Sequence, residues 1–346
     1  MTHLQDILDI HFEPAGGTKY WLEQQERLHI DARREIASIE DLSLFGLMDV
    51  EALRSLPLLD FVPRRYHDQL HQMILSETGG TSGSPCRRVY SEEDFNNGFV
   101  KPWLTAVERH HFPRGGHWLF VGPSGPHIID RSARAMARSL GSLEPFTLDC
   151  DVRWIKRQAK GSIGYTLYLD HVMSQAMNII QTQEIDTLFT TPPILLLMGE
   201  QMRSEQRQAI RGIHTGGMAM DENSWHNVTC LFPKAVVLPG YGNSLFGVCF
   251  PHTPEQPDVF EPGNGKRLLI ELVPWAGKGQ DGVVPTARAK AGERGRVFCH
   301  ILDPTFLLIN MLERETAVAT PLPNGATGLA DIRPIALPSI KQEGVY

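Results

Sequence analysis

The stretch Thr78-Gly79-Gly80-Thr81-Ser82-Gly83-Ser84-Pro85 is the densest run of turn-forming residues in the chain. Its three glycines allow the backbone to approach an anion closely, and its four hydroxyl side chains add hydrogen-bond donors. The loop therefore has the composition of a phosphate-binding turn. It lacks the Gly-Lys-Ser/Thr ending of a Walker loop and the G-x-G-x-x-G spacing of a dinucleotide site. On composition alone, a flexible polar hairpin is an equally good interpretation.

The sequence after this loop predicts an α/β protein in which strands and helices alternate. Apolar residues at strand or helical spacing follow each other at 118–121, 129–140, 169–180 and 187–190. After Phe232 we expect strands separated by Gly and Pro turns, at 235–238, 244–250, 266–273 and 296–302. From Pro321 onward the sequence shows no further helical or strand period. The expected parts are a helical lead-in over 1–70, α/β subdomains with the loop over 71–234, a β-rich subdomain over 235–332 and a tail over 333–346.

Composition narrows the possible functions. The 346 residues are 42% hydrophobic and 21% charged, which is an ordinary globular mixture. A net charge of −7 leaves no sequence-wide basic field for nucleic acid or an anionic membrane. No apolar run approaches the ~20 residues of a membrane span and no signal peptide is evident, so we expect a cytoplasmic protein. The five cysteines contain no C-x-x-C pair, which predicts free thiols and no metal site.

Three further motifs follow the loop in a fixed order. They are His214-Thr215-Gly216-Gly217-Met218, Gly240-Tyr241-Gly242-Asn243-Ser244 and Gly292-Glu293-Arg294-Gly295-Arg296-Val297. With the loop, they resemble the signature motifs of the AMP-forming adenylating enzymes, a superfamily of acyl- and aryl-CoA synthetases, peptide-synthetase adenylation domains and luciferases. The resemblance extends from about residue 40 to residue 332. It implies the layered α/β subdomains of the adenylating-enzyme large domain plus a β-rich subdomain.

Two other segments narrow the resemblance to one branch. Leu53-Arg54-Ser55-Leu56-Pro57-Leu58 and Gly122-Pro123-Ser124-Gly125-Pro126-His127 are similar to segments of the phenylacetate-CoA ligase branch. That branch acts on aromatic carboxylates. Within it, the chain resembles the short adenylating-type proteins of phenazine (griseoluteic acid) antibiotic biosynthesis.

The resemblance implies a role for each motif residue. ATP or AMP would be held by Thr78, Gly79, Gly80, Thr81, Ser82, Gly83 and Ser84, by the backbone of Gly216, Gly217 and Met218, by the turn Gly240, Tyr241, Gly242, Asn243 and Ser244, and by Glu315 at the ribose. Tyr241 would stack on adenine, and Ser244 and Arg87 would act on the α-phosphate as catalytic groups. The substrate would contact Ser124, His127, His214, Gly216 and Gly217. From the residues alone, a turn aromatic packed on a strand is the favoured interpretation of Tyr241, whereas a pocket role and strand-end packing are equally good interpretations of His127 and His214.

The chain also departs from the family pattern. Cys86 stands where the family's loop ends in Lys or Arg, and Arg87 follows one position later. Leu245 stands where the family carries the Glu that helps to hold Mg²⁺, which puts Mg²⁺ binding in doubt because leucine cannot bind a hard cation. Asn310 replaces an Arg five residues before Glu315. The family's small C-terminal domain, with its catalytic Lys, has no counterpart before Tyr346, so we expect that lid to be absent.

Two functions remain open. The chain activates an aromatic carboxylate, such as a phenazine carboxylic acid, as an acyl-adenylate in secondary-metabolite biosynthesis, together with a partner enzyme that is a reductase or an acyl acceptor. Alternatively, it is a degenerate homologue that binds an aromatic acid or a nucleotide as a carrier or scaffold. Neither function calls for a nucleic-acid or membrane partner, and a homodimer is possible. A chance match of an unrelated α/β protein is the third alternative.

Overall fold

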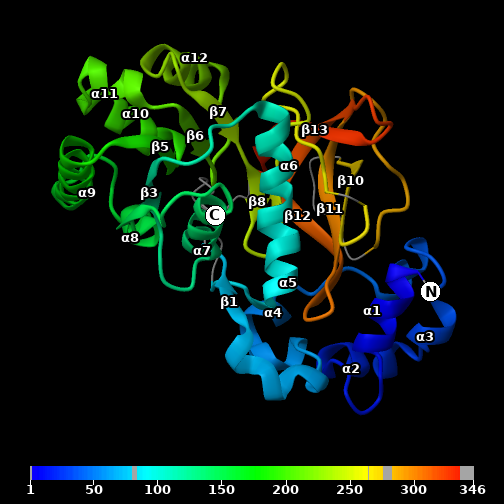
Figure 1. The fold of residues 1–346 in the computed structure, drawn as a ribbon. Helices are drawn as coiled ribbons and strands as arrows, with labels where there is room; N and C mark the ends of the chain where they lie inside the picture. The colour runs from blue at the N-terminus through cyan, green and yellow to red at the C-terminus, as the bar shows by residue number, and fades with distance from the viewer. Residues whose placement is uncertain (1, 80–83, 264, 276–282, 336–346) are drawn as a thin grey trace. The chain divides into compact units, whose positions relative to one another are not determined.

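The computed structural model describes residues 2–79, 84–263, 265–275 and 283–335 (Figure 1). These residues gather into two compact units. The first contains residues 2–76, 84–97 and 261–335, and the second contains residues 77–79 and 98–260. Four residues of the predicted phosphate-binding loop lie outside the described residues, namely Gly80, Thr81, Ser82 and Gly83.

The second unit is built on a five-stranded parallel sheet in the order β4-β3-β5-β6-β7. Its strands are β3 (His117–Gly122), β4 (Phe146–Asp149), β5 (Ile185–Thr190), β6 (Gly212–Thr215) and β7 (Val236–Pro239). After β3 the chain adds β4 on one side, and the next strand, β5, pairs with the other side of β3. The strand order therefore reverses at β3. Open parallel sheets bind their ligands beyond the carboxyl ends of strands next to such a reversal.

Side chains of this sheet alternate between two covered faces. Leu119 and Val121 face the helices α9 (Ile163–Thr182), α10 (Pro192–Gln201) and α12 (Glu222–Leu231) in one apolar core. The sequence predicted β3, β5 and α9 from the spacing of their apolar residues. Ser162 caps α9 by accepting a hydrogen bond from the Tyr165 N–H, and Pro192 opens α10, where its missing N–H has no partner to lose.

The opposite face carries a ladder of aromatic neighbours. Phe120 pairs in register with Phe189, and Phe189 pairs with His214. Trp103 packs against the His214 ring with a centroid distance of 5.3 Å. The remaining helices of this unit are α6 (Lys101–His110), which carries Trp103, and α7 (Ile128–Ser139), α8 (Val152–Arg157) and α11 (Ser204–Ala209).

A short antiparallel hairpin follows the parallel sheet. It consists of β8 (Tyr241–Asn243) and β9 (Gly247–Cys249). The expected continuous strand over 244–250 is wrong, because the chain reverses between these two strands. Asn243 Oδ1 accepts hydrogen bonds from the N–H groups of Leu245 and Phe246, over 2.8 and 3.1 Å, and this side-chain turn interrupts the strand.

The first unit contains a four-stranded antiparallel sheet in the order β10-β11-β12-β13. Its strands are β10 (Leu268–Pro274), β11 (Arg294–Leu302), β12 (Leu307–Pro321) and β13 (Thr327–Pro334). The expectation of no strand beyond Pro321 is wrong, since β13 pairs with β12 over most of its length. A Pro- and Gly-rich sequence concealed this edge strand because only Gly328 and Leu329 bury fully there.

The N-terminal segment of this unit is helical, as its sequence predicted. Its elements are α1 (His3–His11), α2 (Lys19–Leu28), α3 (Ala32–Glu35), η1 (Glu40–Phe45), α4 (Ala52–Ser55), η2 (Leu58–Phe61) and η3 (Arg64–Gln72). The strands β1 (Ile74–Glu77) and β2 (Arg87–Tyr90) form a small two-stranded sheet, followed by α5 (Glu92–Phe95) and a π-helical turn, η4 (Asn96–Val100). Trp21 links the helical segment to β12 of the four-stranded antiparallel sheet, because its Nε1 donates a hydrogen bond to the carbonyl of Leu307 over 3.0 Å.

Candidate functional site

A pocket lies at the carboxyl edge of the parallel sheet in the second unit. It encloses about 490 Å³ of space free of protein atoms, counting the open solvent at its mouth. Eight of the residues that the sequence motifs singled out line it: His127, His214, Gly216, Gly217, Gly240, Gly242, Asn243 and Ser244. His127 follows β3, and the motif from His214 to Gly217 spans the end of β6. The turn from Gly240 to Ser244 follows β7. The parallel sheet therefore brings three motifs to one edge.

His214 is a deeply buried polar side chain of this pocket. It is 1% exposed, and its Nδ1 lies 2.7 Å from the carbonyl oxygen of Leu238. The Phe189 ring packs against the imidazole at a centroid distance of 4.1 Å. Burial lowers the pKa of His214 to about 4, although the bond to Leu238 opposes this shift. The ring is therefore neutral at pH 7, and with Nδ1–H donated to Leu238, Nε2 is left as an acceptor.

His127 enters the pocket from the N-terminus of α7. It is 3% exposed, and neither of its ring nitrogens has a hydrogen-bond partner among the described residues. A buried polar group without a partner costs about 1–3 kcal/mol. The residue also occupies the N-cap position of a twelve-residue helix without forming a side-chain cap bond. An unpaired imidazole at the positive end of a helix is suited to a polar or anionic ligand group.

Charged neighbours of His127 lie on the segments that surround it. Arg153 Nη1 is 3.0 Å from Glu77 Oε1, and the N–H of Glu77 donates to the carbonyl of Pro126 over 2.9 Å. Burial lowers the pKa of His127, and the Arg153 guanidinium lowers it further, while the carboxylates of Glu77, Asp151 and Asp149 raise it. The balance keeps this imidazole neutral at pH 7, so it can donate through one nitrogen and accept through the other.

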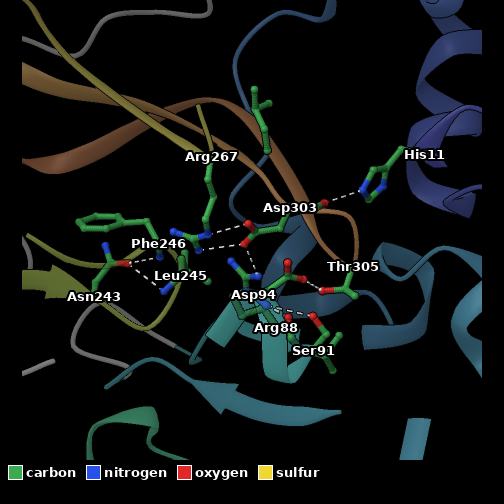
Figure 2. Close-up of polar contacts among 12 residues, drawn as sticks. His11, Arg88, Ser91, Asp94, Asn243, Leu245, Phe246, Arg267, Asp303 and Thr305 are labelled. Atoms are coloured by element: carbon green, nitrogen blue, oxygen red, sulfur yellow. Dashed lines mark hydrogen bonds and ion pairs between the residues drawn. The ribbon is translucent and has the colours of Figure 1, made fainter. Parts of the chain in front are cut away.

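The hairpin places Ser244 at the pocket while it buries Leu245. Figure 2 shows the Asn243 side chain directed at the backbone of Leu245 and Phe246. A Cβ on Gly242 would lie 2.0 Å from the carbonyl oxygen of Gly247, so only glycine fits between these strands. Leu245 is 5% exposed and offers no ligand atom. Among the described residues, no group of three or more His, Cys, Asp or Glu side chains is placed to hold a metal ion.

The backbone of Gly216 also lines the pocket, next to Gly217 and the half-buried Met218. A Cβ on Gly216 would meet one atom, Phe189 Cε2, at an ordinary contact distance of 3.7 Å. The protein itself thus leaves room for a side chain here. Gly217 adopts a positive φ of 77°, which turns the chain away from the strand.

Tyr241 and Ser124 do not line this pocket in the described part of the second unit. Tyr241 is 8% exposed, and its ring packs against Phe246 and Phe260 at centroid distances of 5.8 and 5.9 Å. The N–H of Ser124 donates to Asp149 Oδ1 over 2.9 Å. The stacking of Tyr241 on adenine and the substrate contact of Ser124 stay predictions.

Other predicted nucleotide-binding residues are found outside the pocket lining. Thr78 and Gly79 belong to the second unit, whereas Ser84, Arg87 and Glu315 belong to the first. Ser84 and Arg87 are exposed. Glu315 is half-buried on β12, opposite Pro334 of β13. Their contacts with a nucleotide stay predictions.

Sequence reasoning missed seven residues that line the pocket: Phe99, Ile128, Ile129, Ser132, Met136, Gly247 and Val248. Four of them lie on α7, whose amphipathic pattern was visible but whose pocket-facing side was not. Their apolar side chains make the wall mainly hydrophobic.

Among the described helices, none has the length and apolar content that a membrane span needs.

Comparison with known proteins bears on the fold. No protein-family model matches the chain, and no curated protein matches it. The chain is similar to solved structures of 2-hydroxyisobutyryl-CoA ligase. The open conformation in complex with 2-HIB-AMP and CoA has a TM-score of 0.69 and 15% identity, over 99% of this chain and 76% of the ligase. The thioesterification-state complex has a TM-score of 0.66 and 15% identity, over 95% and 65%.

The chain has the same fold as 2-hydroxyisobutyryl-CoA ligase. A third structure, in the postadenylation state with R3-HIB-AMP, gives a TM-score of 0.68 at 14% identity, over 95% of this chain and 65% of the ligase. These comparisons confirm the expected fold class, a layered α/β part with a β-rich part. The chain spans about two thirds of the length of the ligase in two of these structures, 65%, so the activity of the whole ligase is not transferred with the fold.

Proposed function

We propose that this chain binds an adenine nucleotide, ATP or AMP, and an aromatic carboxylate, and activates the acid as an acyl-adenylate. The observation that supports this proposal most is the pocket at the sheet edge, where two neutral imidazoles, a glycine backbone and the Ser244 side chain converge. The fold it shares with a ligase crystallised with an acyl-AMP supports the same assignment. Neutral walls let an uncharged ring enter while polar groups orient its carboxylate.

The aromatic class of acid is proposed from the pocket wall and the sequence. Phe99, Met136 and Val248 supply apolar surface, and Gly216 leaves space beside them. The similarity of the segments at 53–58 and 122–127 to the phenylacetate-CoA ligase branch supports the same class. A phenazine carboxylic acid in secondary-metabolite biosynthesis is our candidate substrate within it, and a cytoplasmic location fits this role.

The residues contribute to the reaction by binding and orientation. His127, at the N-terminus of α7, offers one donor and one acceptor to the polar end of the acid. Asn243 fixes the turn that holds Ser244 at the pocket wall, so the hydroxyl meets the α-phosphate without reorganisation. Attack of the carboxylate on the α-phosphorus forms the acyl-phosphate bond and releases pyrophosphate, and its rate depends on this alignment. No step is assigned to Mg²⁺.

A second candidate is a binding protein that retains the pocket but forms no adenylate. The burial of Leu245, at the position where an acidic side chain would hold a cation, favours this alternative. Such a protein would carry an aromatic acid or a nucleotide to a partner.

Two assays on the same protein separate the candidates. ATP–pyrophosphate exchange is measured with a panel of aromatic and aliphatic carboxylates, and calorimetry measures binding of AMP and of each acid. Exchange that depends on an aromatic acid supports activation. Binding of AMP and an aromatic acid with exchange at background supports the carrier function and contradicts activation. If neither AMP nor any acid binds, both candidates are wrong.

A further inference from the structure

The helices α8 and α9 of the second unit present large apolar side chains to solvent. Ile163 and Leu167, one turn apart on α9, are 80% and 64% exposed, and Trp154 on α8 is 38% exposed. Trp154 stacks on Tyr168 with a centroid distance of 4.8 Å, which joins the two helices into one surface. We call Trp154, Ile163, Leu167 and Tyr168 the α8–α9 patch. Contiguous exposed apolar side chains of this kind mark interaction sites.

The charge beside the patch is opposite to that of the chain. Residues 153–160 contain four Lys or Arg and no Asp or Glu, whereas the chain as a whole carries a net charge of −7. Arg157 and Lys160 are exposed, and Arg153 is already paired with Glu77 and Asp151. Arg157 and Lys160 can therefore pair with carboxylates of an acidic partner at the rim of the patch.

A short series of hydrogen bonds and one ion pair links the α8–α9 patch to the segment before His127. Asp151 caps α8 by accepting from the N–H groups of Arg153 and Trp154, over 2.9 and 3.3 Å. Arg153 in turn pairs with Glu77, whose N–H is bonded to Pro126, the residue before His127. The Arg153 and Glu77 side chains thus link the α8–α9 patch to the segment that precedes His127.

We propose that the α8–α9 patch docks an acidic helical protein partner, which lays an apolar face with an acidic rim on Trp154, Ile163 and Leu167. This rests on the proposed function, since an activated acyl group needs an acceptor, and an acidic, helical carrier protein has the chemistry the patch recognises. An anionic membrane is a poorer occupant, because the exposed cations described beside the patch, Arg157 and Lys160, would contribute about 1 kcal/mol each against the net charge of −7 of the chain. A second copy would bring the same cations face to face.

The test measures docking without ATP or acid, so that its failure differs from a failure of adenylation. The probe is a purified, strongly acidic acyl carrier protein, titrated by calorimetry at low and physiological salt. We expect micromolar binding that weakens with salt and falls at least tenfold in I163S/L167S and in R157E. The control is Leu143→Ser. Leu143 is also an exposed leucine, at 70%, but it precedes the amino end of β4, whereas α8 follows the carboxyl end of that strand.

Three results would overturn the proposal. In the first, the wild type does not bind the carrier protein. In the second, I163S/L167S binds it as tightly as the wild type. In the third, the protein binds anionic vesicles or forms a dimer through this patch and does not bind the carrier protein. The last is measured by flotation with vesicles of phosphatidylglycerol and phosphatidylcholine, and by sedimentation of the protein alone. The substituted side chains are exposed, so unchanged thermal unfolding of each variant shows that lost binding is not lost folding.

Discussion

Arg88 donates a hydrogen bond from Nη2 to Asp303 Oδ2 over 2.9 Å, although 215 residues separate the two in the chain. Arg267 donates from its own Nη2 to the same oxygen, also over 2.9 Å, and its Nε lies 2.6 Å from Asp303 Oδ1 as an ion pair without hydrogen-bond alignment. The Arg88 and Asp303 side chains are 0% and 1% exposed. Figure 2 shows the Arg267 and Arg88 side chains beside the Asp303 carboxylate. One carboxylate thus bridges two buried guanidinium groups in the first unit.

Removing that carboxylate should destabilise the first unit strongly. Asp303→Ala leaves two buried cations without their shared partner, and breaking a buried ion pair costs about 3–5 kcal/mol. Urea unfolding measures the loss of free energy. The matched control is Asp331→Ala, since Asp331 pairs with Arg294 and Arg333 at a side chain that is 45% exposed. A surface pair is worth at most about 1 kcal/mol, so equal effects of the two variants would contradict this account.

Stability should fall as the pH is lowered from 7 to 5. Burial lowers the pKa of His11, His214 and His300 to about 4 in the folded protein, against an ordinary value of 6.5. Between pH 6.5 and 4 the unfolded chain therefore binds more protons than the folded one, and each histidine costs roughly 2 kcal/mol of stability at pH 5. Urea midpoints measured at pH 7, 6 and 5 should decrease, and a constant midpoint would show that these rings are protonated while folded.

Two glycine variants should separate folding from ligand binding. Gly216→Ala adds a methyl group that the protein accommodates, so we expect an unchanged Tm and at least a tenfold weaker affinity for the aromatic acid. Gly242→Ala drives a methyl group into the carbonyl of Gly247, so we expect a lower Tm. Thermal unfolding and calorimetry check both. An unaltered affinity in Gly216→Ala would mean that the acid binds elsewhere.

Replacing His127 by Leu should stabilise the protein and weaken binding. Leucine removes two buried nitrogens that have no partner among the described residues, a gain of about 1–3 kcal/mol if packing is kept. The same change removes the donor and acceptor that we assign to the acid. Urea unfolding and calorimetry on one preparation measure both effects. Tight binding by His127→Leu would show that this imidazole does not contact the ligand.

Sequence predicted the strands β3, β5 and β7 from short apolar runs, although it placed residues 235–238 in the β-rich subdomain and not in the parallel sheet. It predicted eight pocket residues because three short motifs end up at one edge of that sheet. The strand β13 escaped, since its pairing with β12 depends on a distant partner and few of its side chains are buried. The bond between Arg88 and Asp303 escaped for the same reason. Local patterns carry no information about a charge 215 residues away.

The central claim is that the pocket between His127, His214 and Gly216 holds the acyl group of an acyl-adenylate. A crystal structure of the chain with a non-hydrolysable phenylacetyl-sulfamoyl-adenosine tests it most directly. The account predicts the aromatic ring beside Gly216, with a polar atom of the ligand within hydrogen-bond distance of a His127 nitrogen. A ligand bound at another site, with this pocket unchanged, would contradict it.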